Sequence, residues 1–256
     1  MYLGNWARVE GSKFISKLLD NAAQIEQTLE YSLFQPGGIQ LEIVNIILET
    51  KFSEDTKPVV KEQLENLIFR VLVDESIAVD RKCAFVEKLV SATPPLVSAN
   101  VETAALASIL SNPSPETLKC CVTFMHNRPN MSTKHIPLIC TAVRTHLHYV
   151  ETNCDTELNL KICSELSHIL GLTRRKKDDW GSVAPYLVAD ILHTNLLLED
   201  QKLKQSLASG IQTLLDICDN HTHEYLSANL SPAANEVFKI CLETHKNQHK
   251  FTANTT

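Results

Sequence analysis

Glycine and aromatic residues are scarce in this chain of 256 residues, and their scarcity argues against a β-sheet protein. The sequence contains 7 glycines and 10 prolines, and its aromatic residues are 8 Phe, 5 Tyr and 2 Trp. Sheet proteins use glycine in tight turns, and they use aromatic and β-branched residues along their strands. The composition therefore favours an all-α fold.

Long apolar runs are also missing. No stretch approaches the about 20 uncharged apolar residues that a membrane-spanning helix needs, so we expect no membrane span. The first residues lack the basic segment followed by an apolar one that marks a signal peptide. We therefore expect the eight cysteines to lie in a reducing compartment, mostly as small apolar residues of the core.

An excess of positive charge is absent as well. The net charge is −6, and residues 1–150 carry 14 basic against 16 acidic side chains, while residues 151–256 carry 10 against 14. Dedicated nucleic-acid-binding domains are usually basic. The charge balance therefore indicates that protein contacts dominate over RNA contacts, and it leaves room only for a local basic patch.

No catalytic or cofactor-binding motif is found. The glycine pair Gly37-Gly38 lacks both a preceding strand and a following Lys-Ser/Thr, and there is no Gly-x-Ser-x-Gly or His-Glu-x-x-His. His245 and His249 are four residues apart, but two ligands do not make a zinc site. Cys241 with His245 lacks an orienting group for nucleophilic catalysis. We expect no enzyme activity, no cofactor and no metal site.

The sequence does contain helical periodicity along its whole length. Apolar residues recur at helical spacing between proline, glycine and capping residues. The segments expected to be helical number about eleven: 14–29, 39–48, 58–72, 77–90, 100–110, 115–128, 136–149, 156–170, 183–192, 200–218 and 232–245. Ser114, Asp155 and Ser182 are expected helix caps, Asn100 another, and Gly171 an expected helix end.

Many short helices with short links and no strands are typical of a HEAT- or armadillo-like helical-repeat array. A compact multi-helix bundle has the same packing physics with a different connectivity, so it remains the alternative architecture. We divide the chain into a helical-repeat region, residues 1–157, and a C-terminal helical domain, residues 158–256.

A four-residue basic run, Arg174 to Lys177, lies in the clearest expected loop, residues 173–181. Such a run can be a nuclear import signal or a phosphate contact. It can equally be a solvated loop neutralised by Asp178 and Asp179, because short charge runs are common on protein surfaces. The sequence leaves these readings open.

From about residue 158 the chain carries five blocks in a characteristic order. They are APYLVAD at 184–190, GIQTLLDIC at 210–218, YLSANL at 225–230, EVFK at 236–239 and HKNQHKF at 245–251. In this order they resemble the C-terminal domain of the Unhealthy Ribosome Biogenesis protein 2 family, also called nucleolar pre-ribosomal-associated proteins. Ser209 stands where the family pattern has proline, and Cys241 and His245 stand where it has tyrosines, which is the pattern of a diverged member.

The resemblance implies a function without implying any catalytic residue. It implies a non-catalytic scaffold of the nucleolus that acts on early precursors of the large ribosomal subunit and in rRNA processing. It also implies two partners, a larger helical-repeat protein and a DEAD-box RNA helicase. Family members are large, so the chain looks like a C-terminal piece or a shortened gene model.

If such a scaffold touches pre-rRNA, the expected phosphate contacts are its exposed basic residues. These are Arg174, Arg175, Lys176, Lys177, Lys246 and Lys250. Reversing the charge of the four-residue run is then expected to weaken association with pre-ribosomes. The alternative function is a generic helical-repeat adaptor unrelated to ribosomes; an enzyme with a Cys- or His-based site is the third reading.

Overall fold

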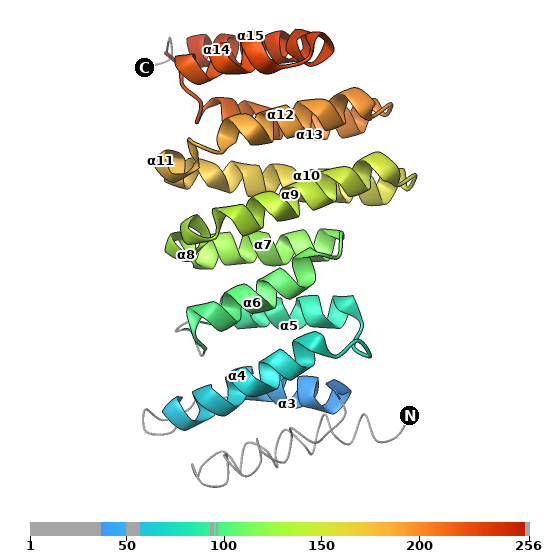
Figure 1. Ribbon diagram of the computed structural model, residues 1–256, viewed down its shortest axis with the longest axis vertical. Coiled ribbons are helices and arrows are strands. Elements are labelled where there is room, and N and C mark those ends of the chain that lie inside the picture. The colour runs from blue at the N-terminus through green and yellow to red at the C-terminus, as the bar shows by residue number, and fades with distance from the viewer. Residues whose placement is uncertain (1–36, 50–56, 93–94, 96, 254–256) are drawn as a thin grey trace. The chain divides into compact units, whose positions relative to one another are not determined.

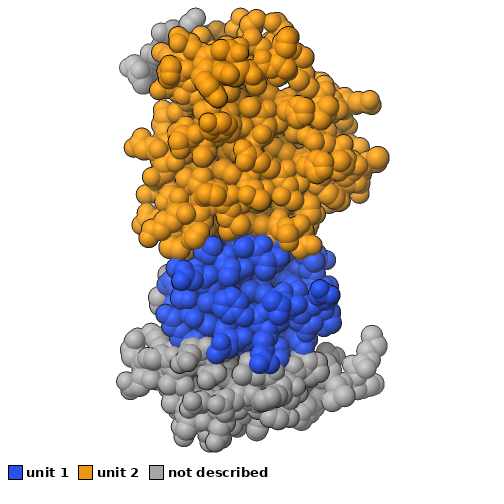
Figure 2. All heavy atoms as spheres, viewed as in Figure 1, with its two compact units in different colours: residues 1–109 blue, residues 110–256 orange. Residues whose placement is uncertain are grey.

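The computed structural model describes residues 37–49, 57–92, 95 and 97–253, and every regular element in these ranges is a helix (Figure 1). The chain forms two compact units, residues 1–109 and 110–256, which Figure 2 shows in different colours. The expected all-α class is therefore confirmed. The helix expected at 14–29 lies outside the described residues.

The first unit contains four described helices. They are α3 (Gly37–Glu49), α4 (Lys57–Val73), α5 (Val79–Ser91) and α6 (Ala99–Leu110). Helix α3 packs against α4 and α5, and Leu41 and Val44 are buried on its inner face. An ion pair of 2.8 Å between Arg81 of α5 and Glu42 of α3 lies at the surface of this contact.

The second unit holds the remaining helices. They are α7 (Pro115–Asn127), α8 (Pro129–Lys134), α9 (Ile136–Thr152), α10 (Thr156–Thr173), the 3₁₀ helix η1 (Arg174–Lys176), α11 (Lys177–Trp180), α12 (Ala184–Leu197), α13 (Gln201–Leu215), α14 (Asn220–Asn229) and α15 (Pro232–Ala253). No helix of the described residues is both long and apolar enough to cross a membrane.

Helices of the second unit pack on neighbours that lie a short way along the chain. Helix α10 packs between α7 and α13, while α12 packs between α9 and the α14–α15 pair. Contacts of α9 with α10 and of α12 with α13 join these two series of helices. Each helix therefore buries its apolar face against successive neighbours, and Figure 1 shows the helices of this unit side by side in chain order.

Local capping signals explain where several helices begin. The Ser114 hydroxyl accepts a hydrogen bond from the backbone N–H of Thr117, whose own hydroxyl accepts from the Ser114 N–H, so a capping box starts α7. Carboxylates of Asp155 and Asp200 accept backbone N–H groups at the starts of α10 and α13. The caps expected at Ser114 and Asp155 are confirmed.

Three other expected boundaries were wrong by one to three residues, and α12 and α15 end five and eight residues beyond the expected ends. Helix α6 already includes Ala99, so Asn100 is not its cap. Helix α12 begins after Val183 without a side-chain cap, although Ser182 was expected to supply one. Helix α10 continues through Gly171 to Thr173 because the Thr173 side chain is buried in the core, where it donates to the Leu170 carbonyl over 2.6 Å.

Two helices, α8 and α14, were missed by the periodicity because each has few apolar residues. Only Ser132 is buried in α8, and only Leu226 in α14. The two compact units also divide at residue 109 rather than at the expected residue 157. Residue 157 lies in the first turn of α10, which packs against both α7 and α13, so no division of the packing falls there.

Candidate functional site

The basic run Arg174 to Lys177 is helical, which corrects the expected loop at 173–181. Residues 174–176 form η1, and Lys177 opens α11. Trp180, at the end of α11, is only 1% exposed. Burying so large an apolar side chain is strongly favourable, and it holds the run against the helical core.

Arg174 is joined to two distant segments through one carboxylate, and we call this group the Asp216 clasp. The guanidinium of Arg174 lies 3.0 Å from Asp216, which directly follows α13. His245 of α15 places its Nε2 atom 2.7 Å from the other oxygen of the same carboxylate. The side chains of Asp216 and His245 are 16% and 14% exposed, so the clasp ties η1 and the end of α13 to α15.

The next two residues of the run reach α7 and α8. The guanidinium of Arg175 donates a hydrogen bond of 2.8 Å to Nδ1 of His126, and the ammonium of Lys176 donates one of 3.2 Å to the Asn130 side chain. The C-terminal ends of α7, α10 and α13 therefore lie at one end of the second unit. Figure 1 shows α8 and α11 on that same side.

Lys177, three residues after Arg174, and Lys246, directly after His245, are both exposed. An open depression of about 320 Å³ beside the clasp is lined by Arg174, Lys177, Asp216 and Ile217. Burial lowers the pKa of His223, and the positive charges of His245 and Lys246 nearby lower it further. The structure thus brings Lys246 to the clasp that Arg174 forms, while Lys250 lies further along α15.

Neutralising Asp216 provides a test of the clasp. We expect Asp216→Asn to lower the free energy of unfolding by about 1–2 kcal/mol, because the Arg174 ion pair is lost from a partly buried position. Urea denaturation of the full chain, followed by circular dichroism at low and high salt, measures this. Asp178→Asn, at an exposed carboxylate two residues from the end of η1, is the control with the same charge change. Equal stability of the two variants would contradict the clasp.

Several buried cysteines are poorly suited to act as nucleophiles. Burial raises the pKa of Cys121 and Cys163 to about 12 and that of Cys218 to about 11, so these thiols stay protonated at neutral pH. Burial also raises the pKa of Cys241, and His245 contacts Asp216 instead. Within the described residues, no three His, Cys, Asp or Glu side chains are placed to hold a metal ion.

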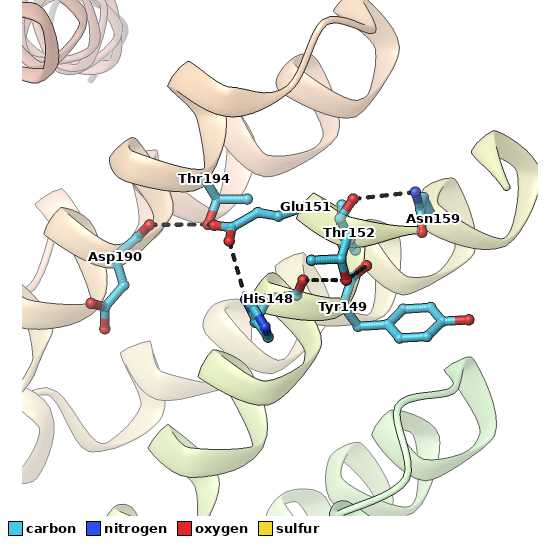
Figure 3. A network of polar contacts seen from close by, with 8 residues as sticks. His148, Tyr149, Glu151, Thr152, Asn159, Asp190 and Thr194 are labelled. Carbon is cyan, nitrogen blue, oxygen red and sulfur yellow. Dashed lines mark hydrogen bonds and ion pairs between the residues drawn. The ribbon is translucent and has the colours of Figure 1, made fainter. Parts of the chain in front are cut away.

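A second polar cluster joins α9 to α12 (Figure 3). The hydroxyl of Thr194 donates a hydrogen bond of 2.7 Å to Glu151, and His148 lies 3.4 Å from the same carboxylate. Further along the two helices, Arg144 donates to Asp190 over 2.7 Å. These contacts hold α9 against α12.

Sequence reasoning missed the partners of the basic run, since Asp216, His126 and Asn130 are between 40 and 50 residues away from it. One signal was present in the sequence. No Asp or Glu occurs between Glu116 and Glu151, a stretch that contains Arg128 and Lys134. A carboxylate-free stretch in a chain of net charge −6 marks a locally basic surface.

Comparisons of the chain with protein-family models, with curated proteins and with solved structures find no match. The family resemblance accordingly rests on the five sequence blocks alone. All five blocks fall in or directly after four helices, α12, α13, α14 and α15, and α12 contacts each of the other three.

Proposed function

We propose that this chain is a non-catalytic scaffold built as a HEAT- or armadillo-like helical-repeat array. The packing of α10 between α7 and α13, and of α12 between α9 and α14–α15, carries this proposal. In a repeat array each helix pair rests on the next, whereas the helices of a compact bundle surround one common core. An extended stack offers partner-binding surface along its length, which is what a scaffold requires.

The partners we propose are those of early large-subunit assembly in the nucleolus. The support is the family resemblance together with the positions of its residues. Gly210 of the second block sits so close to α10 that an added Cβ atom would lie 2.5 Å from Leu170, so close helix packing accounts for this glycine. Asp216 of the same block holds the clasp. We propose pre-ribosomal proteins, including a larger helical-repeat protein and a DEAD-box RNA helicase, as partners in rRNA processing.

A generic helical adaptor is the second candidate, and exposed apolar side chains favour it. Tyr186, Tyr225 and Ile240, on α12, α14 and α15, are 54%, 47% and 64% exposed. Large side chains of this kind are typical of protein–protein contacts. Such side chains are expected in a scaffold of any protein assembly, so they do not favour a ribosomal role.

Affinity purification of the tagged full chain from its native cell distinguishes the two candidates. We expect precursor RNA of the large ribosomal subunit, together with nucleolar assembly proteins, to be enriched over a tag-only preparation. If protein partners are recovered without precursor RNA and without nucleolar proteins, the ribosomal assignment is contradicted and the generic adaptor is supported.

The double variant Tyr186→Ala/Tyr225→Ala is expected to lose protein partners while keeping the helical content of the wild type.

A further inference from the structure

One end of the second unit gathers basic side chains from two segments that are far apart in the sequence. We define the basic surface as residues 126–135 and 174–177. It contains six basic residues, Arg128, Lys134, Arg174, Arg175, Lys176 and Lys177, and it is bordered by the carboxylates of Asp178, Asp179 and Asp216. The contacts of Arg175 with His126 and of Lys176 with Asn130 hold the two segments together. From this arrangement we infer that the basic surface binds the phosphate backbone of single-stranded RNA.

The contacts divide the basic residues into two roles. Arg174 lies 3.0 Å from the Asp216 carboxylate, so its charge is balanced and it positions η1. Lys134 and Lys177 are exposed, and neither forms a hydrogen bond or ion pair with any described residue. Their ammonium groups are free to neutralise phosphates, and phosphate neutralisation dominates the affinity of proteins for nucleic acids. Lys177 also lines the open depression beside the clasp.

Ring and amide groups between the cations favour RNA over an acidic protein segment. Because a guanidinium only donates hydrogen bonds, Nδ1 of His126 accepts from Arg175, which leaves Nε2 of the ring as the donor. His126 and Asn130 are exposed beside the cations. Imidazole and guanidinium planes stack on unpaired bases, and amides contact base edges and ribose hydroxyls. A carboxylate side chain of a protein has no base plane to stack on the His126 ring or the guanidinium groups.

This inference deepens the proposed function by naming RNA as a direct partner, but its test uses the purified chain alone. The probe is a fluorescein-labelled RNA single strand of 20 nucleotides, titrated with full-length protein by fluorescence anisotropy. Lys134→Glu/Lys177→Glu is expected to weaken binding by at least about tenfold and to reduce the dependence of affinity on salt concentration. Both substitutions are at exposed positions, so circular dichroism is expected to match that of the wild type.

The matched control is Lys161→Glu/Lys202→Glu, which makes the same charge change near the starts of α10 and α13. Those helix starts lie at the end of the second unit opposite to the basic surface, and the control is expected to bind RNA like the wild type. Three results would each overturn the inference. They are an equal loss of RNA affinity in both double variants, no RNA binding by the wild type at 50 mM salt, and competition by polyglutamate that equals competition by unlabelled RNA. If the chain purifies with pre-ribosomes but does not bind RNA in this assay, the direct RNA contact is contradicted and the proposed function is not.

Discussion

Trp180→Ala is expected to lower the free energy of unfolding by about 3–5 kcal/mol, since truncating a fully buried aromatic residue removes its burial and leaves a cavity. Trp180 is only 1% exposed at the end of α11, directly after the basic run. Its loss is expected to free η1 and α11 from the core. Urea denaturation of the full chain by circular dichroism measures the stability, and hydrogen exchange of residues 174–180 locates the change.

Tyr225→Ala is the control for this variant, because Tyr225 is an aromatic residue of the same unit that is 47% exposed. Its effect is expected to stay within about 0.5 kcal/mol, as at most surface positions. If Trp180→Ala proved as stable as Tyr225→Ala, the buried anchor of the basic run would be disproved.

His146→Leu is expected to remove a pH-dependent part of the stability. The His146 side chain is fully buried, and its Nδ1–H donates to the Ala142 carbonyl over 2.7 Å. Its Nε2 atom accepts from the Ser114 N–H over 3.2 Å and lies 2.9 Å from the Thr117 hydroxyl. The neutral ring therefore ties α9 to the start of α7. An apolar replacement removes this acceptor and leaves the Ser114 N–H with the Thr117 hydroxyl alone, which costs about 0.5–1.5 kcal/mol.

The direction of the pH effect follows from burial, which lowers the pKa of His146. The unfolded chain then binds a proton more readily than the folded one, so the wild type keeps its full stability above the ordinary imidazole pKa of about 6.5. It loses this stability as the pH falls below that value toward the lowered pKa. Unfolding free energies measured between pH 5 and 8 test this.

His148→Leu is the control, because His148 lies two residues further on the same helix with its side chain 77% exposed. The stability difference between wild type and His146→Leu is expected to shrink as the pH falls, whereas the difference for His148→Leu is expected to stay small throughout. A constant difference for His146→Leu would show that the folded protein takes up the proton as readily as the unfolded chain.

The sequence predicted best the features that a few neighbouring residues determine. The caps at Ser114 and Asp155 depend on side chains bonding to their own helix, so short patterns reveal them. The basic run was placed in a loop because its charges were visible and the burial of Trp180 was not. That burial depends on helices distant in the chain, and no local pattern encodes it.

The candidate site divides in the same way. All six basic residues expected to contact RNA were chosen by charge alone. The structure shows that Arg174 is paired with the Asp216 carboxylate, whereas Lys177 and Lys246 are exposed. Asp216, which pairs with Arg174, and His126, which accepts from Arg175, belong to other parts of the chain. Their pairing with η1 required the fold, although the absence of carboxylates between residues 116 and 151 was already visible.

The helical form of the basic run also has a consequence for cell biology. A transport receptor that reads a basic segment as an extended strand needs the backbone of residues 174–177 to be drawn out straight. That would break η1 and α11, separate Arg174 from Asp216 and pull Trp180 from the core. Such a receptor would therefore bind these residues only in a chain that has not yet folded.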